Sequence, residues 1–166
     1  MSDRLSTLHL LCGKIAAGKS SLAAELAREP NTVLISEDDW LAALFADQLE
    51  TPRDYVRCAA LLRKAMVPHV IGLLNARVSV VLDFPANTLE TRTWMREILD
   101  GTQVEHQMHV LETPDALCLE RLHARNAAED HPFSATEAQF QAFSRHFVPP
   151  QPDEGFNILV HKTKGP

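Results

Sequence analysis

The segment from Gly13 to Ser20 constrains this chain more than any other. It reads Gly-Lys-Ile-Ala-Ala-Gly-Lys-Ser, with four residues between the two glycines. This spacing is typical of a loop that wraps a phosphate, because glycine allows tight turns and a close backbone approach that a Cβ atom would block. In such a loop Lys19 would reach the β- and γ-phosphates of a nucleotide, and the Ser20 hydroxyl would bind Mg²⁺. A helix beginning at Gly18 would add its N-terminal N–H groups and its dipole.

The flanking sequence has the context that this phosphate-binding loop, or P-loop, requires. Residues 5–11 form an apolar run typical of a buried strand, and Leu22 and Leu26 have the i, i+4 spacing of a helix face. Strand, loop and helix in this order favour a phosphate site over a glycine-rich turn with an incidental lysine. The residues expected to contact the nucleotide are Gly13, Lys14, Ala16, Ala17, Gly18, Lys19, Ser20 and Ser21.

Composition narrows the class of protein. With 166 residues and 45% hydrophobic residues, we expect a single domain over 1–166. A net charge of −6 without a Lys/Arg cluster argues against a general nucleic-acid or membrane surface. The N-terminus is too short and polar for a signal peptide and no apolar run reaches the length of a membrane span, so we expect a cytoplasmic protein. The three cysteines lack ligand spacing and are expected to be reduced core residues.

Acidic residues follow the second expected strand. Residues 32–35 are an apolar run, and Ser-Glu-Asp-Asp occupies 36–39 directly after it. Open α/β sheets bind ligands beyond the carboxyl ends of their strands, so these acids are candidates for chemistry. The alternative is that Asp38 or Asp39 only caps the helix expected from Trp40 onward. We expect one of the two aspartates to cap and the other to act.

The third expected strand, residues 78–83, ends in Asp83. An apolar strand that ends in aspartate is typical of a Walker B strand, in which the carboxylate holds Mg²⁺ directly or through water. The alternative is an aspartate that caps a turn.

The helices after this strand carry several arginines. Asn87 and Glu90 resemble a capping box for a helix through Leu99. Arg92 and Arg96 share one face of this helix, and we expect them to lie in solvent; the alternative is that one of them points toward the site. Thr51-Pro52 and Thr113-Pro114 each predict a helix N-terminus, and Pro68 should kink or split the first of these helices.

Arg121 and Arg125 lie on one face of the helix after Thr113, close to the polar loop 127–133. Two guanidinium groups on such a lid, about residues 121–134, would stabilise charge on a transferring phosphoryl group while the loop excludes water. The alternative is an exposed helix end favoured by the helix dipole.

Residues 103–111 and 156–160 are predicted to form the last two strands. Ser134 and Glu137 resemble a further capping box, Phe140, Phe143 and Phe147 are expected to be core residues, and residues 148–155 should be extended.

The P-loop, the acidic end of the second strand, Val80-Val81-Leu82-Asp83 and Arg121-Leu122-His123-Ala124-Arg125 occur in an order that resembles the P-loop small-molecule kinases. This group contains shikimate, gluconate, chloramphenicol and adenylylsulfate kinases and the zeta-toxin-like kinases. The resemblance covers residues 5–161 and is closest to single-domain members known only as ATP-binding proteins of the AAA family. It implies a three-layer α/β P-loop NTPase fold with a five-stranded parallel sheet in the order 2-3-1-4-5 and a small lid.

The resemblance also implies residue roles. Family members often show Asp-x-Asp after the second strand, where this chain has Ser36-Glu37-Asp38. Asp38 matches the second aspartate, which meets the acceptor hydroxyl, and lid arginines close on ATP. The expected catalytic residues are therefore Lys19, Asp38, Arg121 and Arg125, with Ser20 and Asp83 as the Mg²⁺ ligands.

These features predict an ATP-dependent kinase that phosphorylates a hydroxyl of an unidentified small molecule, with ATP and Mg²⁺ as cofactors. One alternative is a nucleotide switch or ATPase that acts through a protein partner. A GTPase would normally carry an Asn/Thr-Lys-x-Asp motif, whereas Thr163-Lys164-Gly165-Pro166 lacks the aspartate. A hydrolysing ATPase usually has glutamate after the Walker B aspartate, and here Phe84 follows Asp83. Both absences favour a kinase. A zeta-toxin-like kinase that acts on a nucleotide sugar is the other alternative.

Overall fold

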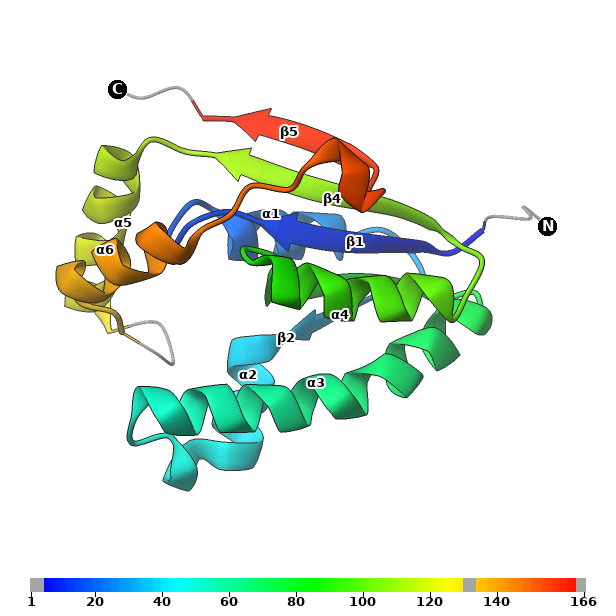
Figure 1. Ribbon diagram of the computed structural model, residues 1–166, viewed down its shortest axis with the longest axis horizontal. Helices are drawn as coiled ribbons and strands as arrows, with labels where there is room; N and C mark the ends of the chain where they lie inside the picture. Colours follow the sequence, from blue (N-terminus) through cyan, green and yellow to red (C-terminus); the bar gives the residue numbers. More distant parts are fainter. Residues whose placement is uncertain (1–4, 130–133, 164–166) are drawn as a thin grey trace.

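The computed structural model describes residues 5–129 and 134–163. In these residues a parallel sheet of five strands has the order β2-β3-β1-β4-β5 (Figure 1). The strands are β1 (Thr7–Cys12), β2 (Thr32–Ser36), β3 (Ser79–Pro85), β4 (Glu105–Glu112) and β5 (Ile158–Lys162). The predicted sheet order is confirmed. All five carboxyl ends therefore lie at one edge of the sheet.

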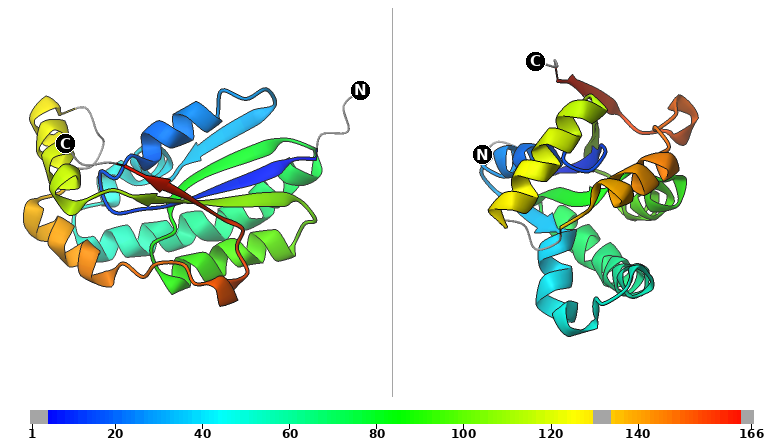
Figure 2. Two further views of the ribbon diagram at one scale, coloured as in Figure 1. Left: turned by 90° about the horizontal axis from the view of Figure 1, so that it is seen from above. Right: turned by 90° about the vertical axis from the view of Figure 1, so that its left-hand side faces the viewer.

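Helices cover both faces of this sheet and stand beyond its carboxyl edge. They are α1 (Lys19–Leu26), α2 (Glu37–Phe45), α3 (Pro52–Asn75), α4 (Leu89–Asp100), α5 (Asp115–Ala128) and α6 (Glu137–His146), with 3-10 turns η1 (Ala46–Gln48) and η2 (Pro152–Glu154). α1 lies on one face and α3 and α4 on the other, while α5 and α6 stand beyond the strand ends (Figure 2). The predicted three layers are thus confirmed. No helix in the described part of the chain is both long and apolar enough to cross a membrane.

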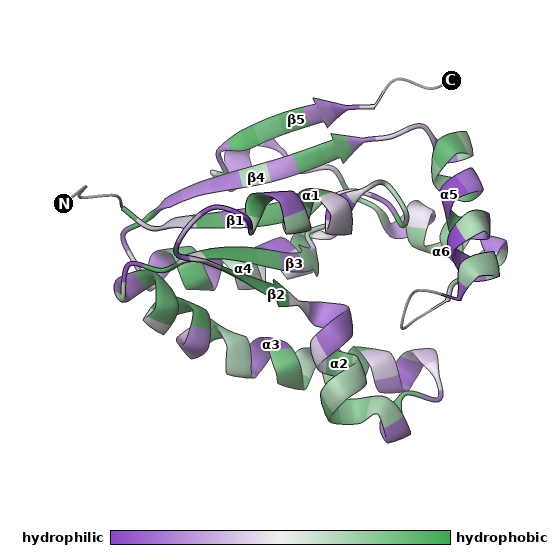
Figure 3. Ribbon diagram, turned by 180° about the vertical axis from the view of Figure 1, so that it is seen from behind, coloured by the Kyte–Doolittle hydropathy of each residue, from purple (hydrophilic) through white to green (hydrophobic). Residues whose placement is uncertain are grey.

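Hydrophobic residues fill the space between these layers. β2 and β3 are hydrophobic over most of their length, whereas hydrophobic and hydrophilic residues alternate along α5 and α6 (Figure 3). The largest cluster joins the sheet to α3 and α4, and a smaller one places Leu11 and Val81 against Ala23 of α1. A third cluster of Ala17, Cys118, Leu122 and Phe140 packs α5 and α6 against the P-loop. The three cysteines are buried free thiols, as predicted.

The caps of α2 and α4 differ from the sequence prediction by one to three positions. α2 begins at Glu37 and is capped by Ser36, whose Oγ accepts from the backbone N of Asp39 at 3.3 Å, so neither Asp38 nor Asp39 is the cap. Thr88 caps α4 in place of Asn87. These neighbouring residues are all good caps, and the one chosen is the one at which the extended backbone ends.

Other expectations about helices are corrected as well. The capping box of α6 is Thr136 with Gln139, and Thr113 does not cap α5, which has no side-chain cap. α3 begins at Pro52 after the Thr51 cap, as predicted, and it is not split in two at Pro68, which lies inside the helix. Phe143 is exposed, although it was expected in the core. The 148–155 segment is also not wholly extended, because it contains η2.

Three histidines form a row across the sheet. His9 of β1 shares a hydrogen bond with His109 of β4 at 3.0 Å, and His109 shares another with His161 of β5 at 2.9 Å. Burial lowers the pKa of His9. Burial, followed by the charges of His9 and His161, lowers the pKa of His109 to about 4. The central imidazole is therefore neutral near neutral pH.

Candidate active site

The P-loop connects β1 to α1 and needs both of its glycines, each for a different reason. Gly18 has φ +109°, a conformation that strains any residue with a Cβ atom. At Gly13, a Cβ would lie 3.2 Å from Leu111 Cβ and 3.3 Å from Ala17 Cβ, so glycine permits close packing against β4. Ala16 has φ +59°, a left-handed conformation that is uncommon for a residue with a side chain. Alternation of backbone conformation in this way turns N–H groups inward into an anion-binding concavity.

Lys19 lies back on its own loop. Its Nζ donates hydrogen bonds to the backbone oxygen of Gly13 and to that of Lys14, the latter at 2.8 Å. Burial lowers the pKa of Lys19, while the nearby Asp83 carboxylate acts in the opposite direction. These two bonds use two of the three N–H donors of the ammonium group, so one donor is left for a phosphate bound in the loop.

Ser20 and Asp83 lie together, as the predicted metal site requires. Ser20 Oγ donates to Asp83 Oδ2 at 3.1 Å, and Asp83 stands near the end of β3 in register with Ser36 of β2. Burial raises the pKa of Asp83, and the hydrogen bond from Ser20 and the charge of Lys19 oppose that shift. Mg²⁺ is commonly held by one or two carboxylates and completed by phosphate and water oxygens, so a hydroxyl beside one carboxylate fits this ion.

Asp38 is less exposed than Asp39, and its charge acts on more of the groups near the P-loop. The Asp38 side chain is half-buried in the first turn of α2, and Asp39 is exposed. The negative charge of Asp38 acts to raise the pKa of Lys19, Asp83 and Tyr55. Among the groups with a shifted pKa, the charge of Asp39 acts on Asp83. Of the two candidate bases, Asp38 therefore has the better position.

Glu37 is a buried acid, one of the three acids after the second strand, to which the sequence alone assigns no separate role. It is 1% exposed and accepts hydrogen bonds from Tyr55 Oη and, at 3.4 Å, from Arg63 Nη2. Burial raises the pKa of Glu37 despite the charge of Arg63. This cluster joins the first turn of α2 to α3. No local pattern marks Glu37, since its partners are 18 and 26 residues away.

The structure brings one of the two predicted lid arginines to the P-loop. Arg121 Nη1 donates to the backbone oxygen of Ala17 at 3.3 Å. Arg125 lies one helical turn farther along α5 and lines a separate cavity of about 340 Å³ with Asn126 and residues 134–136. Its Nε is buried and has no hydrogen-bond partner among the described residues. Residues 130–133 of the predicted lid lie outside the described residues.

Two polar residues that sequence reasoning had placed as helix caps hold the P-loop instead. Asn87 Oδ1 accepts from the backbone N of Gly13 at 2.9 Å, and its Nδ2 donates to the backbone oxygen of Gly13 at 2.8 Å. Thr113 Oγ1 donates to the backbone oxygen of Ala17 at 2.9 Å. Both residues follow closely on the carboxyl end of a strand. That position is a sequence signal that could have identified them as part of the site.

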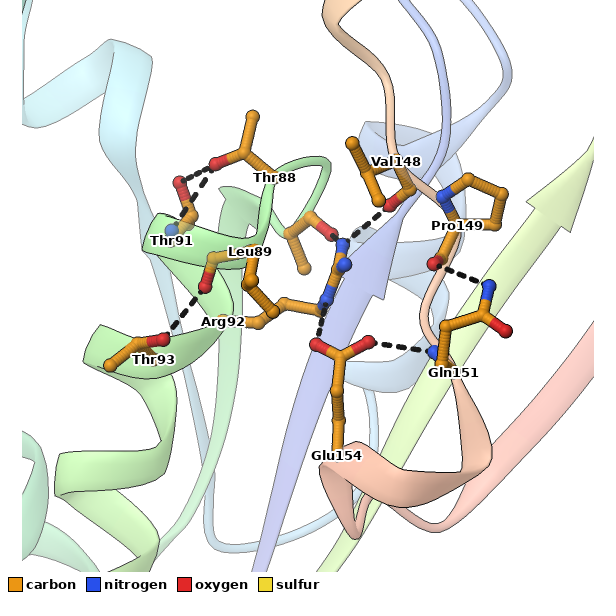
Figure 4. Close-up of polar contacts among 10 residues, drawn as sticks. Thr88, Leu89, Thr91, Arg92, Thr93, Val148, Pro149, Gln151 and Glu154 are labelled. Atoms are coloured by element: carbon orange, nitrogen blue, oxygen red, sulfur yellow. Dashed lines mark hydrogen bonds and ion pairs between the residues drawn. The ribbon is translucent and has the colours of Figure 1, made fainter.

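Arg92 is buried, which contradicts its predicted solvent exposure. The side chain is 1% exposed, and Nη1 donates to the backbone oxygens of Ala86 at 2.9 Å and Val148 at 2.7 Å. Its Nε forms an ion pair with Glu154 Oε1 at 2.6 Å (Figure 4). Helical spacing indicates which residues share a face, but it does not show that residues 148–154 cover this face of α4. Arg92 therefore fixes the backbone beside Asn87.

Comparison with known proteins agrees with this geometry. Residues 8–150 match the AAA_33 family, described as an AAA domain. Among curated proteins, no sequence shows significant similarity to this chain. A candidate kinase from Chloroflexus aurantiacus J-10-fl has a TM-score of 0.77 and 18% identity, and the match covers 97% of this chain and 87% of that one.

Two further structures have the same fold. The Mycobacterium tuberculosis APS kinase CysC, in complex with AMPPNP and APS, has a TM-score of 0.62 at 19% identity over 93% of this chain and 88% of that one. Chaetomium thermophilum Kti12, in complex with ADP-AlF3, has a TM-score of 0.69 at 12% identity over 93% of this chain and 88% of that one. The family match covers most of the chain, and the likeness to the solved structures shows its fold. This chain belongs to the AAA_33 family of AAA domains and has the fold of the P-loop small-molecule kinases.

Proposed function

We propose that this chain is an ATP-dependent kinase, a single cytoplasmic domain that transfers the γ-phosphoryl group of ATP to a hydroxyl of a small molecule. One observation carries the proposal. Lys19, the Ser20–Asp83 pair, Asp38 and Arg121 gather at the carboxyl edge of the sheet although they come from four different segments. Phosphoryl transfer requires mainly positioning and charge stabilisation, and this set of groups supplies both.

Binding begins with the P-loop. Its inward N–H groups and the N-terminus of α1 bind the phosphates, and Lys19, held by the carbonyls of Gly13 and Lys14, pairs with them through its remaining N–H donor. Ser20 and Asp83 would hold Mg²⁺, which neutralises charge on the β- and γ-phosphates when it is bound. Arg121, already in contact with the loop, stabilises the negative charge that develops on the transferring group.

Asp38 orients the acceptor. Its carboxylate accepts the proton of the acceptor hydroxyl as the hydroxyl oxygen bonds to the γ-phosphorus. The bond from that phosphorus to the β,γ-bridging oxygen breaks, and ADP leaves with the electron pair. Glu37, held by Tyr55 and Arg63, keeps the first turn of α2 in place, so that the Asp38 side chain starts from a fixed backbone.

The position after Asp83 supports a kinase over a hydrolysing ATPase. Phe84 occupies it with no exposed surface and packs on Trp94 at 5.2 Å between ring centroids. This position therefore supplies an apolar ring to the core where an ATPase usually has a water-activating glutamate. A nucleotide-sugar acceptor would use the same groups, so it differs from the leading proposal in substrate alone.

The proposal is tested by measuring ADP release from ATP and Mg²⁺ across sugars, polyols, nucleosides, nucleotide sugars and aminoglycosides. Acceptor-dependent turnover is expected, and Asp38→Asn should lower it by roughly a hundredfold or more, in line with general-base contributions. The matched control is Asp39→Asn, because Asp39 is the exposed neighbour and its backbone N–H keeps the Ser36 cap. Acceptor-independent ADP release in the wild type would contradict a kinase. Loss of transfer in Asp39→Asn but not in Asp38→Asn would make Asp39 the base.

A further inference from the structure

We propose that Thr113 is a positioning residue for phosphate binding: it holds the Ala17 carbonyl toward α5, so that the N–H of the same peptide unit, on Gly18, faces the concavity of the P-loop. The inference rests on the proposed nucleotide site and deepens it, because it adds a residue outside the P-loop. Thr113 directly follows β4 and is 96 residues from Ala17 in sequence.

The Ala17 carbonyl and the Gly18 N–H belong to one peptide unit. Peptide bonds in the described residues are trans, and in a planar trans peptide the C=O and N–H bonds point in opposite directions. Two donors bind the Ala17 oxygen, Thr113 Oγ1 at 2.9 Å and Arg121 Nη1 at 3.3 Å. Both donors come from α5 or from the residues just before it. The Gly18 N–H therefore points away from α5, as an N–H group that binds a phosphate in the loop requires.

Gly18 makes a restraint on this peptide unit necessary. Rotation of a peptide plane changes ψ of the preceding residue and φ of the following one, and glycine adopts either sign of φ at little cost. Gly18, with φ +109°, thus permits the conformation of the loop without enforcing it. A rotated plane would turn the Ala17 carbonyl, an acceptor, toward the phosphate in place of a donor. The Thr113 hydroxyl, the nearer of the two donors, opposes that rotation.

Thr113 is itself held by tertiary contacts. Its Oγ1 lies 3.2 Å from Thr163 Oγ1, and the backbone N of Thr163 donates to the Glu112 oxygen at 3.1 Å. Cys118 Sγ donates to the Thr113 backbone oxygen at 3.8 Å, and Cys118 is buried in the same cluster as Ala17. The chain's own contacts therefore fix the place of the hydroxyl beside the P-loop.

The first residue of the P-loop shows the same arrangement. Asn87 Nδ2 donates to the Gly13 backbone oxygen at 2.8 Å, and that carbonyl shares a peptide unit with the N–H of Lys14. Asn87 comes shortly after β3, as Thr113 comes directly after β4. Two strand ends thus each supply a side-chain donor to a P-loop carbonyl. This repetition supports an orienting role for such a donor.

The experiment compares ADP binding by the wild type, Thr113→Val and Thr113→Ser, using calorimetry and NMR of protein labelled with ¹⁵N-glycine. Valine keeps the shape of threonine without its hydroxyl, and serine restores the hydroxyl. With six glycines in the sequence, the Gly18 amide signal can be followed, and a hydrogen bond to phosphate moves it downfield. Thr113→Val should weaken ADP binding about tenfold and lose most of this shift at saturating ADP, whereas Thr113→Ser should keep both. Thr113→Ala removes the hydroxyl without adding a methyl group and should behave as Thr113→Val does.

The control is Thr93→Val, which removes a threonine hydroxyl that donates to the Leu89 backbone oxygen at 2.9 Å within α4. It should match the wild type in ADP affinity and in the Gly18 shift. A wild-type Gly18 shift in Thr113→Val and Thr113→Ala would overturn the inference even if ADP affinity falls, because the N–H would still face the phosphate. ADP affinity in these two variants equal to that of the control would also overturn it. Absence of ADP binding in the wild type would instead refute the proposed function.

Discussion

Acidification should destabilise this protein through His109, the central residue of the histidine row. The ring is 2% exposed and its pKa is about 4, against an ordinary value of 6.5. Since the folded-state pKa lies below the unfolded one, the unfolded chain binds the proton first, and stability falls as pH decreases from about 6.5 to 4. Integrated over this window, the loss in free energy of unfolding is about 3 kcal/mol. That is a large share of a typical stability of about 5–15 kcal/mol.

The measurement is urea unfolding at pH 7 and pH 4 for the wild type and His109→Gln. Glutamine can still donate and accept hydrogen bonds but does not titrate, so the wild type should lose about 3 kcal/mol more than the variant between the two pH values. The lowered pKa of His9 acts in the same direction and would remain in the variant. His69→Gln is the control because His69 is exposed, and it should follow the wild type. An equal acid loss in wild type and His109→Gln would show that His109 is not the responsible group.

Four further substitutions probe the P-loop and the lid. Lys19→Ala should weaken ATP binding and leave the fold intact, which isothermal calorimetry and circular dichroism would check; unchanged affinity and turnover would place the phosphate site elsewhere. Gly18→Ala should cost about 1 kcal/mol or more in urea unfolding because of the φ of +109°, and a neutral effect would argue against that conformation. Arg121→Ala should raise the activation barrier by about 2–4 kcal/mol, and so lower kcat, while it affects ATP affinity less. Arg125→Ala should lower kcat less than Arg121→Ala does, because Arg125 lines a separate cavity. A larger loss of kcat in Arg125→Ala, measured by steady-state kinetics, would contradict this.

The sequence predicted the parts of the site that depend on local spacing. The P-loop glycines, Ser20 and Asp83 were identified because a loop between a strand and a helix, and the end of an apolar strand, are local patterns. The sheet order came from the family resemblance to P-loop kinases. The structure places Ser20 and Asp83 in contact, and it joins Arg121 to the loop but not Arg125.

The missed features depend on contacts between distant segments. Asn87 was read as a helix cap because a capping pattern is local, whereas its partner Gly13 belongs to another strand end. Arg92 was expected in solvent because its cover, the 148–154 segment, comes 56 or more residues later. Glu37 is one of the candidate acids after the second strand, but the sequence does not predict its structural role because its partners lie on α3. Adjacent polar residues such as Ser36 and Asp38 could each cap a helix, and only the tertiary structure selects between them.

The fate of the γ-phosphoryl group tests the proposed kinase activity most directly. The protein is incubated with ATP, Mg²⁺ and the acceptor that gives the strongest ADP release, and the products are followed by ³¹P NMR. A kinase produces one phosphomonoester of the acceptor for each ADP, with little inorganic phosphate, and Asp38→Asn slows both products together. Inorganic phosphate formed in step with ADP, at the same rate with and without acceptor, would instead show that the chain hydrolyses ATP and is not a kinase.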